Sequence, residues 1–122
     1  MKNKNSFLQR LAITQGRHLK IINNKIQLFP EKNWQNEMKL FKLTKLKYVE
    51  WVVSSENFKK NPLCQVNGFK TINKNLVKNK IKCRSVDLDF IVKENPLNFS
   101  KKNLNIFTQK IETISNNAIK IG

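Results

Sequence analysis

Several segments of the chain have the residue pattern of β-strands. Apolar residues alternate or pair over residues 19–28, a segment that ends at Pro30, and they alternate with polar residues in SVDLDFIV at 85–92. The run YVEWVVSS at 48–55 is β-branched and aromatic, and FKTI at 69–72 is a shorter run of the same kind. Patterns of this kind are typical of half-buried strands.

Two other segments have helical spacing. From Glu31 onwards, apolar residues that include Trp34 and Met38 recur every three to five positions, with Glu37 near the start, where the helix dipole favours an acid. Ser100 is a candidate N-cap for a second helix. The apolar stripe of that helix consists of Leu104, Phe107, Ile111 and Ile114. Asn116 and Asn117 then predict a turn into a final strand at 118–122.

The order of these elements predicts an α+β fold. It reads as a ferredoxin-like βαββαβ arrangement, with an antiparallel-rich sheet, both helices on one face and a long basic β-hairpin. A chain of 122 residues is the length of one domain. We therefore predict a basic N-terminal arm at 1–18 and a single domain at 19–122, with the hairpin projecting at about 66–88.

Charge adds a prediction about partners. The chain has 24 Lys and Arg against 8 Asp and Glu, a net charge of +16, and this charge favours binding to a polyanion. Hydrophobic residues make up 39% of the chain, which is too many for a solvated tail. No window approaches the apolar length of a membrane span, so we expect no membrane association.

The basic residues concentrate in the predicted hairpin. Between Glu56 and Asp87 the sequence has no acid and eight basic residues. Aliphatic residues are interleaved with the lysines, and an assembly would cover them, whereas a merely solubilising loop would leave them exposed. Lysine is suited to neutralising phosphates rather than to reading bases. The predicted rRNA-binding residues are Lys70, Lys74, Lys78, Lys80, Lys82 and Arg84.

The candidate catalytic and metal-binding residues are few and scattered. Cys64 and Cys83 are 19 positions apart, and the single histidine, His18, is far from both. This spacing supports neither a zinc site nor a Cys/His catalytic pair, and we expect both cysteines to be reduced packing residues. Asp87 and Asp89 fit a solvated strand face better than a metal site. We therefore expect no catalysis, no cofactor and no small-molecule substrate.

Codon bias bears on the compartment. The chain has 21 Lys, three Arg and 18 Asn, a composition expected from an AT-rich coding sequence. Its first residues are Lys- and Asn-rich, whereas import presequences prefer Arg and Ser. We expect a protein that is encoded and used in the mitochondrion, although a bacterial cytosol with an AT-rich genome fits nearly as well.

Four segments, NPLCQVNGFKTINKNLVKNK, DLDFIV, SKKNLNIFTQKIETI and AIKIG, occur in an order that resembles the small-subunit ribosomal proteins of the S-ten family. The resemblance covers about residues 19–122. The tip residues 75–77, Asn-Leu-Val, depart from the family's Ser-Pro-His. The positions with identical or similar residues are Pro62, Leu63, Phe69, Thr71, Ile72, Lys74, Asn79, Lys80 and Phe90.

The resemblance implies a structural protein in the head of the small ribosomal subunit, with its hairpin between rRNA and neighbouring small-subunit proteins. Two alternatives stay open. One is a mitochondrially encoded accessory subunit of a respiratory-chain complex, which would act through protein contacts of Trp34, Trp51 and the aliphatic residues. The other is a different ribosomal-protein family, because Val66-Asn67-Gly68 is similar to a turn in S-four-type RNA-binding modules.

Overall fold

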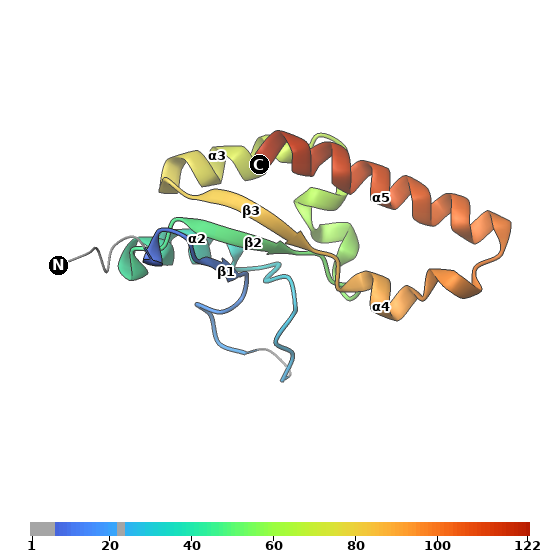
Figure 1. Ribbon diagram of the computed structural model, residues 1–122, viewed down its shortest axis with the longest axis horizontal. Coiled ribbons are helices and arrows are strands. Elements are labelled where there is room, and N and C mark those ends of the chain that lie inside the picture. The colour runs from blue at the N-terminus through green and yellow to red at the C-terminus, as the bar shows by residue number, and fades with distance from the viewer. Residues whose placement is uncertain (1–6, 22–23) are drawn as a thin grey trace.

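Three short strands form a parallel sheet in the order β1–β2–β3 (Figure 1). The computed structural model describes residues 7–21 and 24–122. β1 is Ala12–Thr14, β2 is Tyr48–Val52 and β3 is Lys82–Asp87. β2 lies in the centre and pairs in parallel with each neighbour.

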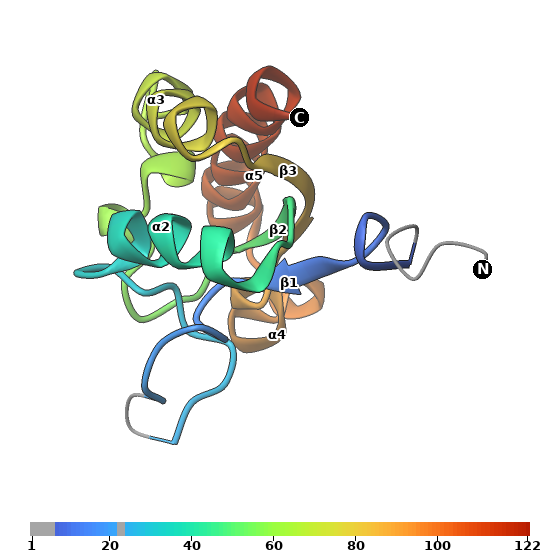
Figure 2. The same ribbon diagram turned by 90° about the vertical axis from the view of Figure 1, so that its left-hand side faces the viewer.

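The helices lie against one face and one edge of this sheet. α2 and α3 cover the same face, and the long α5 lies beside α3 and β3, where its first half extends past the sheet (Figures 1 and 2). The α-helices are α2 (Trp34–Thr44), α3 (Phe69–Asn79), α4 (Phe90–Glu94) and α5 (Lys101–Ile121), and the short 3-10 turns are η1 (Phe58–Lys60), η2 (Pro62–Cys64) and η3 (Pro96–Asn98).

The predicted ferredoxin-like, antiparallel-rich sheet is wrong, and so is the predicted β-hairpin. The segment expected to form the hairpin is α3 followed by β3. Ile72 and Leu76 are four residues apart and buried, so they form one helical stripe, whereas residues 70, 74 and 78 are exposed. Because a helix connects β2 to β3, the two strands run in the same direction, as crossover connections require.

Two further strands predicted from the sequence are absent. The described part of 19–28 consists of turns and irregular chain with a single β-bridge residue at Lys25, and residues 22–23 lie outside the described part. The segment 118–122 does not form a strand because α5 continues to Ile121, with Ile114, Asn117 and Ile121 extending its buried stripe. The edge strand β1 instead lies within the segment expected to be an arm, of which residues 1–6 are not described.

The other local predictions are confirmed, except for the strand predicted at 85–92. The helix expected after Glu31 is α2, and the strand expected from Tyr48 is β2. Ser100 caps α5, where its side chain accepts a hydrogen bond from the backbone N–H of Asn103 at 3.3 Å. The strand predicted at 85–92 is present only over residues 85–87, because β3 ends at Asp87 and α4 begins at Phe90.

The core lies between the sheet and the helices. Val49, Trp51 and Val53 are fully buried on the inner face of β2 and its continuation, where Met38 and Phe41 of α2 belong to the same cluster. Fully burying a side chain of this size stabilises a fold by roughly 1.5–3 kcal/mol. The opposite face of the sheet is not covered by α2, α3 or α5 in Figure 2.

A close approach of two chain segments positions the start of α3. A Cβ atom on Gly68 would lie 1.7 Å from the carbonyl oxygen of Pro62, so only glycine fits there. Asn61 fixes the same region, because its side-chain oxygen accepts from Trp51 Nε1 and from the Leu63 N–H, each at 3.0 Å. The turn after β2 is therefore tied to the centre of the sheet.

Candidate nucleic-acid interface

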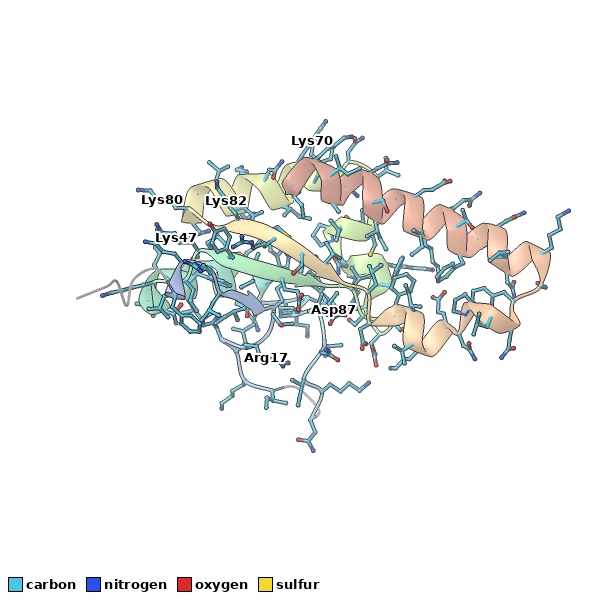
Figure 3. The ribbon with its side chains drawn as sticks, in the orientation of Figure 1. Arg17, Lys47, Lys70, Lys80, Lys82 and Asp87 are labelled. Atoms are coloured by element: carbon cyan, nitrogen blue, oxygen red, sulfur yellow. The ribbon has the colours of Figure 1, made fainter. Side chains whose placement is uncertain are left out.

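The parallel sheet gathers lysines at the edge where its strands begin. Because α2 leads into β2 and α3 leads into β3, both helices end at this edge. Lys45 and Lys80 are the left-handed C-cap residues of α2 and α3, with φ of 59° and 56°. Lys47 and Lys82 come just after them, and Figure 3 shows Lys47, Lys80 and Lys82 close together at the strand starts. We call Lys45, Lys47, Lys80 and Lys82 the basic edge.

A groove between α2 and α3 extends this positive surface. It is an open depression of about 500 Å³ without an acidic side chain in its lining. Lys70, Lys74 and Lys78 follow each other at four-residue intervals along α3, so they are about 6 Å apart along the helix axis. The α2–α3 groove is lined by Gln35, Asn36, Lys39, Lys70, Thr71, Lys74, Asn75 and Lys78.

Three of the eight acidic residues form ion pairs with other lysines of the described residues. Lys25 and Lys93 contact Glu56, and Lys60 contacts Glu31 at 2.8 Å. Lys110 contacts Glu94 at 2.5 Å. Glu56 lies after β2, on the carboxyl side of the sheet, and its two lysine partners lower its pKa to about 2. These three paired acidic residues thus lie away from the basic edge.

The structure divides the six residues predicted to bind rRNA between three places. Lys70, Lys74 and Lys78 line the α2–α3 groove, and Lys80 and Lys82 belong to the basic edge. Arg84 lies on the uncovered face of the sheet, with its guanidinium carbon 4.5 Å from the centre of the Tyr48 ring. No ion pair found among residues 7–21 and 24–122 includes any of the six.

Sequence reasoning missed the contribution of α2 to this surface. Lys39 and the amides Gln35 and Asn36 line the groove opposite α3. Lys39 Nζ donates to the side-chain oxygen of Asn36 at 3.2 Å. The polar face of the predicted helix at Glu31 already contained these residues, but the pairing of that face with the Lys70 stripe depended on recognising α3 as a helix.

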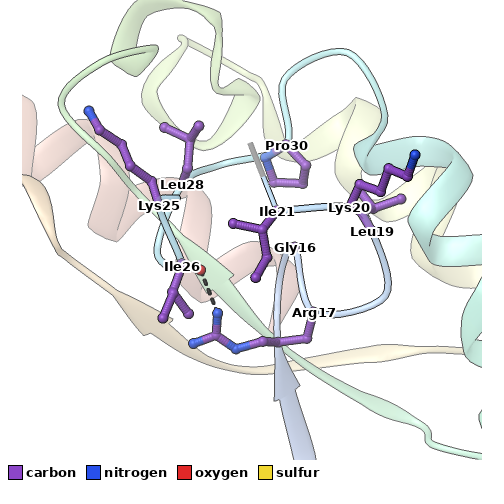
Figure 4. Close-up of a pocket in the computed structure, with 9 residues that line it drawn as sticks. All are labelled: Gly16, Arg17, Leu19, Lys20, Ile21, Lys25, Ile26, Leu28 and Pro30. Carbon is purple, nitrogen blue, oxygen red and sulfur yellow. Dashed lines mark hydrogen bonds between the residues drawn. The ribbon is translucent and has the colours of Figure 1, made fainter. Parts of the chain in front are cut away.

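A smaller pocket lies under the loop between β1 and α2 (Figure 4). Its volume is about 300 Å³. Arg17, Lys20 and Lys25 contribute to its lining, and Arg17 donates to the carbonyl oxygen of Ile26 at 2.5 Å. Among the residues that the structure describes, no acid, histidine, cysteine or hydroxyl side chain lines the pocket.

A buried polar cluster holds the turn after β1. The Glu37 carboxylate accepts from the Gly16 N–H at 2.7 Å, and its side chain is fully buried. Burial raises the pKa of Glu37 and lowers that of His18, whose Nδ1 lies 3.8 Å from the carboxylate. The His18 ring packs against Phe41 at 4.6 Å between ring centres. These contacts give the cluster a structural role in placing the loop.

The two cysteines are free. Burial raises the pKa of the Cys64 thiol to about 12 and that of the Cys83 thiol to about 11. Thiols with such a high pKa are poor nucleophiles at neutral pH. Within residues 7–21 and 24–122, no group of three or more His, Cys, Asp and Glu side chains could hold a metal ion.

Comparisons with known proteins identify no relative of this chain. No family model, curated protein or solved structure matches the chain. Among the helices that the structure describes, none combines the length and the apolar character required to cross a membrane.

Proposed function

We propose that this chain is an RNA-binding structural protein of a ribonucleoprotein particle and has no catalytic activity of its own. The particle we propose is the small subunit of a mitochondrial ribosome. There the α2–α3 groove and the basic edge bind rRNA, and neighbouring ribosomal proteins cover the exposed apolar side chains.

The observation that carries this proposal is a positive surface without acidic partners. Lysines from two helices and from two helix–strand junctions face solvent together, while the ion pairs found among the described residues use other lysines. A high local density of unpaired charge attracts polyanions, and phosphate contacts release counterions. A merely soluble protein gains nothing from leaving these charges adjacent.

Exposed apolar residues support the expectation of protein neighbours. Val92 of α4 and Leu97 of η3 are 81% and 93% exposed, and Leu104 and Ile106 near the start of α5 are each 47% exposed. They lie at the end of the molecule away from the basic edge (Figure 1). The S-ten family's position in the subunit head is not part of the proposal, because it relied on the hairpin that the fold lacks.

Salt-dependent RNA binding tests the proposal. We expect the affinity for RNA to fall steeply with salt concentration, with a slope of about −0.7 to −0.9 for each phosphate contact. The triple variant K70Q/K74Q/K78Q should lose affinity and flatten the slope by about 2–3. Fluorescence anisotropy over a range of salt concentrations measures both quantities.

The matched control is K20Q/K32Q/K59Q, which removes the same charge from lysines that are outside the α-helices and do not line the groove. We expect a much smaller change for this control. Equal effects of the two triple variants would show that net charge alone attracts RNA and would contradict an interface at the groove.

Sedimentation distinguishes the particle from the respiratory-chain alternative. A tagged chain expressed in mitochondria should co-sediment with small ribosomal subunits through a salt-containing gradient. Recovery with a respiratory-chain complex and absence from the ribosomal fractions would overturn the ribosomal proposal, even if the purified chain binds RNA.

A further inference from the structure

Near the strand starts, the face of the sheet opposite α2 and α3 has two rows of side chains with different chemistry, whereas its third row, Val52 and Asp87, is covered, since Val52 is fully buried. The parallel register places Ala12, Tyr48 and Lys82 in one row across the three strands. In the next row, Glu50 Oε1 accepts from the Thr14 hydroxyl at 3.0 Å, and Glu50 Oε2 accepts from the Ser85 hydroxyl at 2.8 Å. The first row therefore contains an aromatic ring with the small side chain of Ala12 beside it, and the second contains a fixed carboxylate.

A β-bulge adds Arg84 to the first row. Val49 pairs with Cys83 and Glu50 pairs with Ser85, so Arg84 has no partner on β2. Bulges redirect a side chain, and they occur frequently at sheet edges and beside active sites. Here Arg84 is exposed, and its guanidinium lies over the Tyr48 ring at 4.5 Å.

We propose that Tyr48 and Arg84 form a stacking platform for an unpaired RNA base. This inference rests on the proposed RNA binding and specifies what the sheet face recognises. Unpaired bases stack on aromatic rings and on guanidinium planes, and a guanidinium that already lies over a ring offers such a plane at a fixed position. A platform of this kind requires an unpaired nucleotide, because bases within a duplex are covered by their neighbours.

The charges around the platform give the nucleotide an orientation. Lys82 lies in the same row as Tyr48, and Lys47 and Lys80 lie beyond it at the basic edge. Glu50 lies on the other side of the platform. Its negative charge repels a phosphate, whereas its carboxylate oxygens can accept a hydrogen bond from a base amino group. The phosphates therefore run along the basic edge, and the base edge faces Glu50.

Binding to abasic RNA distinguishes the contribution of base stacking to the affinity from the contribution of the phosphate charges. The probes are an unstructured RNA of about ten nucleotides and the same RNA with abasic nucleotides, which retains every phosphate. We expect the wild-type chain to bind the base-containing RNA about tenfold more tightly than the abasic RNA. Arg84→Lys, which retains the charge but lacks the guanidinium plane, should lose most of this preference while its salt slope stays unchanged.

Three more variants complete the test. Tyr48→Leu should also lose the preference, whereas Tyr48→Phe retains the ring and should behave like wild type. K70Q/K74Q/K78Q should weaken binding of both RNAs equally and leave the preference intact. If Arg84→Lys and Tyr48→Leu still prefer base-containing RNA as strongly as wild type does, the platform is overturned and the proposed RNA binding stands. If the wild-type chain binds neither RNA, both proposals fall.

Discussion

Glu37 is an acid placed where its charge is unfavourable. Its carboxylate is fully buried at the turn after β1, where the N–H groups of Gly16 and His18 donate to Oε1. Among residues 7–21 and 24–122, Oε2 has no hydrogen-bond partner, and neither ring nitrogen of His18 has one. Desolvation therefore outweighs these hydrogen bonds, and the pKa of Glu37 is raised.

The sign of the pH dependence follows from this raised pKa. A carboxyl whose pKa is higher in the folded than in the unfolded state lowers the free energy of unfolding as the pH rises through that interval. Glu37→Gln keeps an acceptor for Gly16 and removes the charge. We expect it to raise the free energy of unfolding by about 1 kcal/mol at neutral pH, with the gain disappearing below about pH 4.

Urea unfolding of wild type and Glu37→Gln at several pH values measures this difference. His18 Nδ1 lies 3.8 Å from the carboxylate, so the loss of that charge also shifts the titration of His18 to lower pH, and the measured difference contains both effects. The control is Glu112→Gln, which removes an exposed acid and should give no comparable gain. A Glu37→Gln protein that is less stable than wild type at neutral pH would mean that the charged hydrogen bonds outweigh desolvation.

At the scale of single elements, one side chain of α5 makes three hydrogen bonds to the segment 63–69, which leads into α3. Asn117 Nδ2 donates to the carbonyl oxygens of Leu63 and Gln65 at 2.9 and 2.8 Å, and Asn117 Oδ1 accepts from the Phe69 N–H at 3.4 Å. Asn117 is 3% exposed, so water cannot replace these bonds.

Asn117→Ala removes the hydrogen-bond partner of the Leu63 carbonyl and of the Phe69 N–H, whereas the Gln65 carbonyl still accepts from the Gly68 N–H at 3.0 Å. We expect it to lower the free energy of unfolding by about 2–3 kcal/mol. The neighbouring Asn116 is exposed, and Asn116→Ala should change this free energy by less than about 0.5 kcal/mol. Urea unfolding of the two variants checks the difference, and equal effects would refute the attachment.

Substitutions at Val77, which is 76% exposed, test whether the α3 segment is helical. Val77→Pro should cost about 3 kcal/mol, because proline removes a helical hydrogen bond and clashes with the preceding turn. Val77→Ala should be neutral or slightly stabilising, because alanine favours helices. Thermal unfolding followed by circular dichroism compares the two, and a harmless proline would favour a loop at this position.

The sequence allowed prediction of those elements whose apolar stripe is long and unambiguous. α2 and the start of α5 were predictable because apolar residues such as Trp34, Met38 and Ile111 recur with one helical period over several turns. β2 was predictable because its run of residues is β-branched and aromatic. α3 was missed because its apolar residues are few and its lysines separate them. Residues 70, 74 and 78 also have helical spacing, but they are lysines, and a helix was predicted only where apolar residues recur with that spacing.

The end of α5 and the direction of the strands were harder to predict. Asn117 looks like a turn residue, and only its partners in the segment 63–69 show that it is a buried helical position. Strand direction depends on the element that connects two strands. Because the α3 segment was predicted as part of a hairpin, the sheet was predicted to be antiparallel, whereas the connecting helix makes it parallel. The six candidate residues were nevertheless exposed, as RNA contacts require.

At the scale of the whole molecule, chain direction organises the charge. In a parallel sheet with crossover helices, strand starts and helix ends lie at one edge, and strand ends and helix starts lie at the other. Lys45 and Lys80 cap helix ends, and Glu37 lies in the first turn of α2, as the helix dipoles favour. One topology thus separates the lysine-rich edge from most of the acids.

This separation leads to a prediction about stability. Lys70, Lys74 and Lys78 form like-charged pairs four residues apart, and each such pair destabilises a helix by about 0.2–0.5 kcal/mol. Their neighbour Lys39 across the groove adds repulsion. We expect K70Q/K74Q/K78Q to raise the free energy of unfolding by about 1 kcal/mol at low ionic strength while it weakens RNA binding.

Urea unfolding at about 0.05 M and about 0.5 M salt measures the effect, because added salt should screen the repulsion and reduce the gain. The control K20Q/K32Q/K59Q lowers the net charge equally but removes no pair on a shared helix face, so its gain should be smaller. A stabilised variant that has lost RNA affinity would show that the lysine stripe costs the fold stability and serves binding. A destabilised variant would instead mean that these lysines support the fold, and that their clustering is no sign of a binding surface.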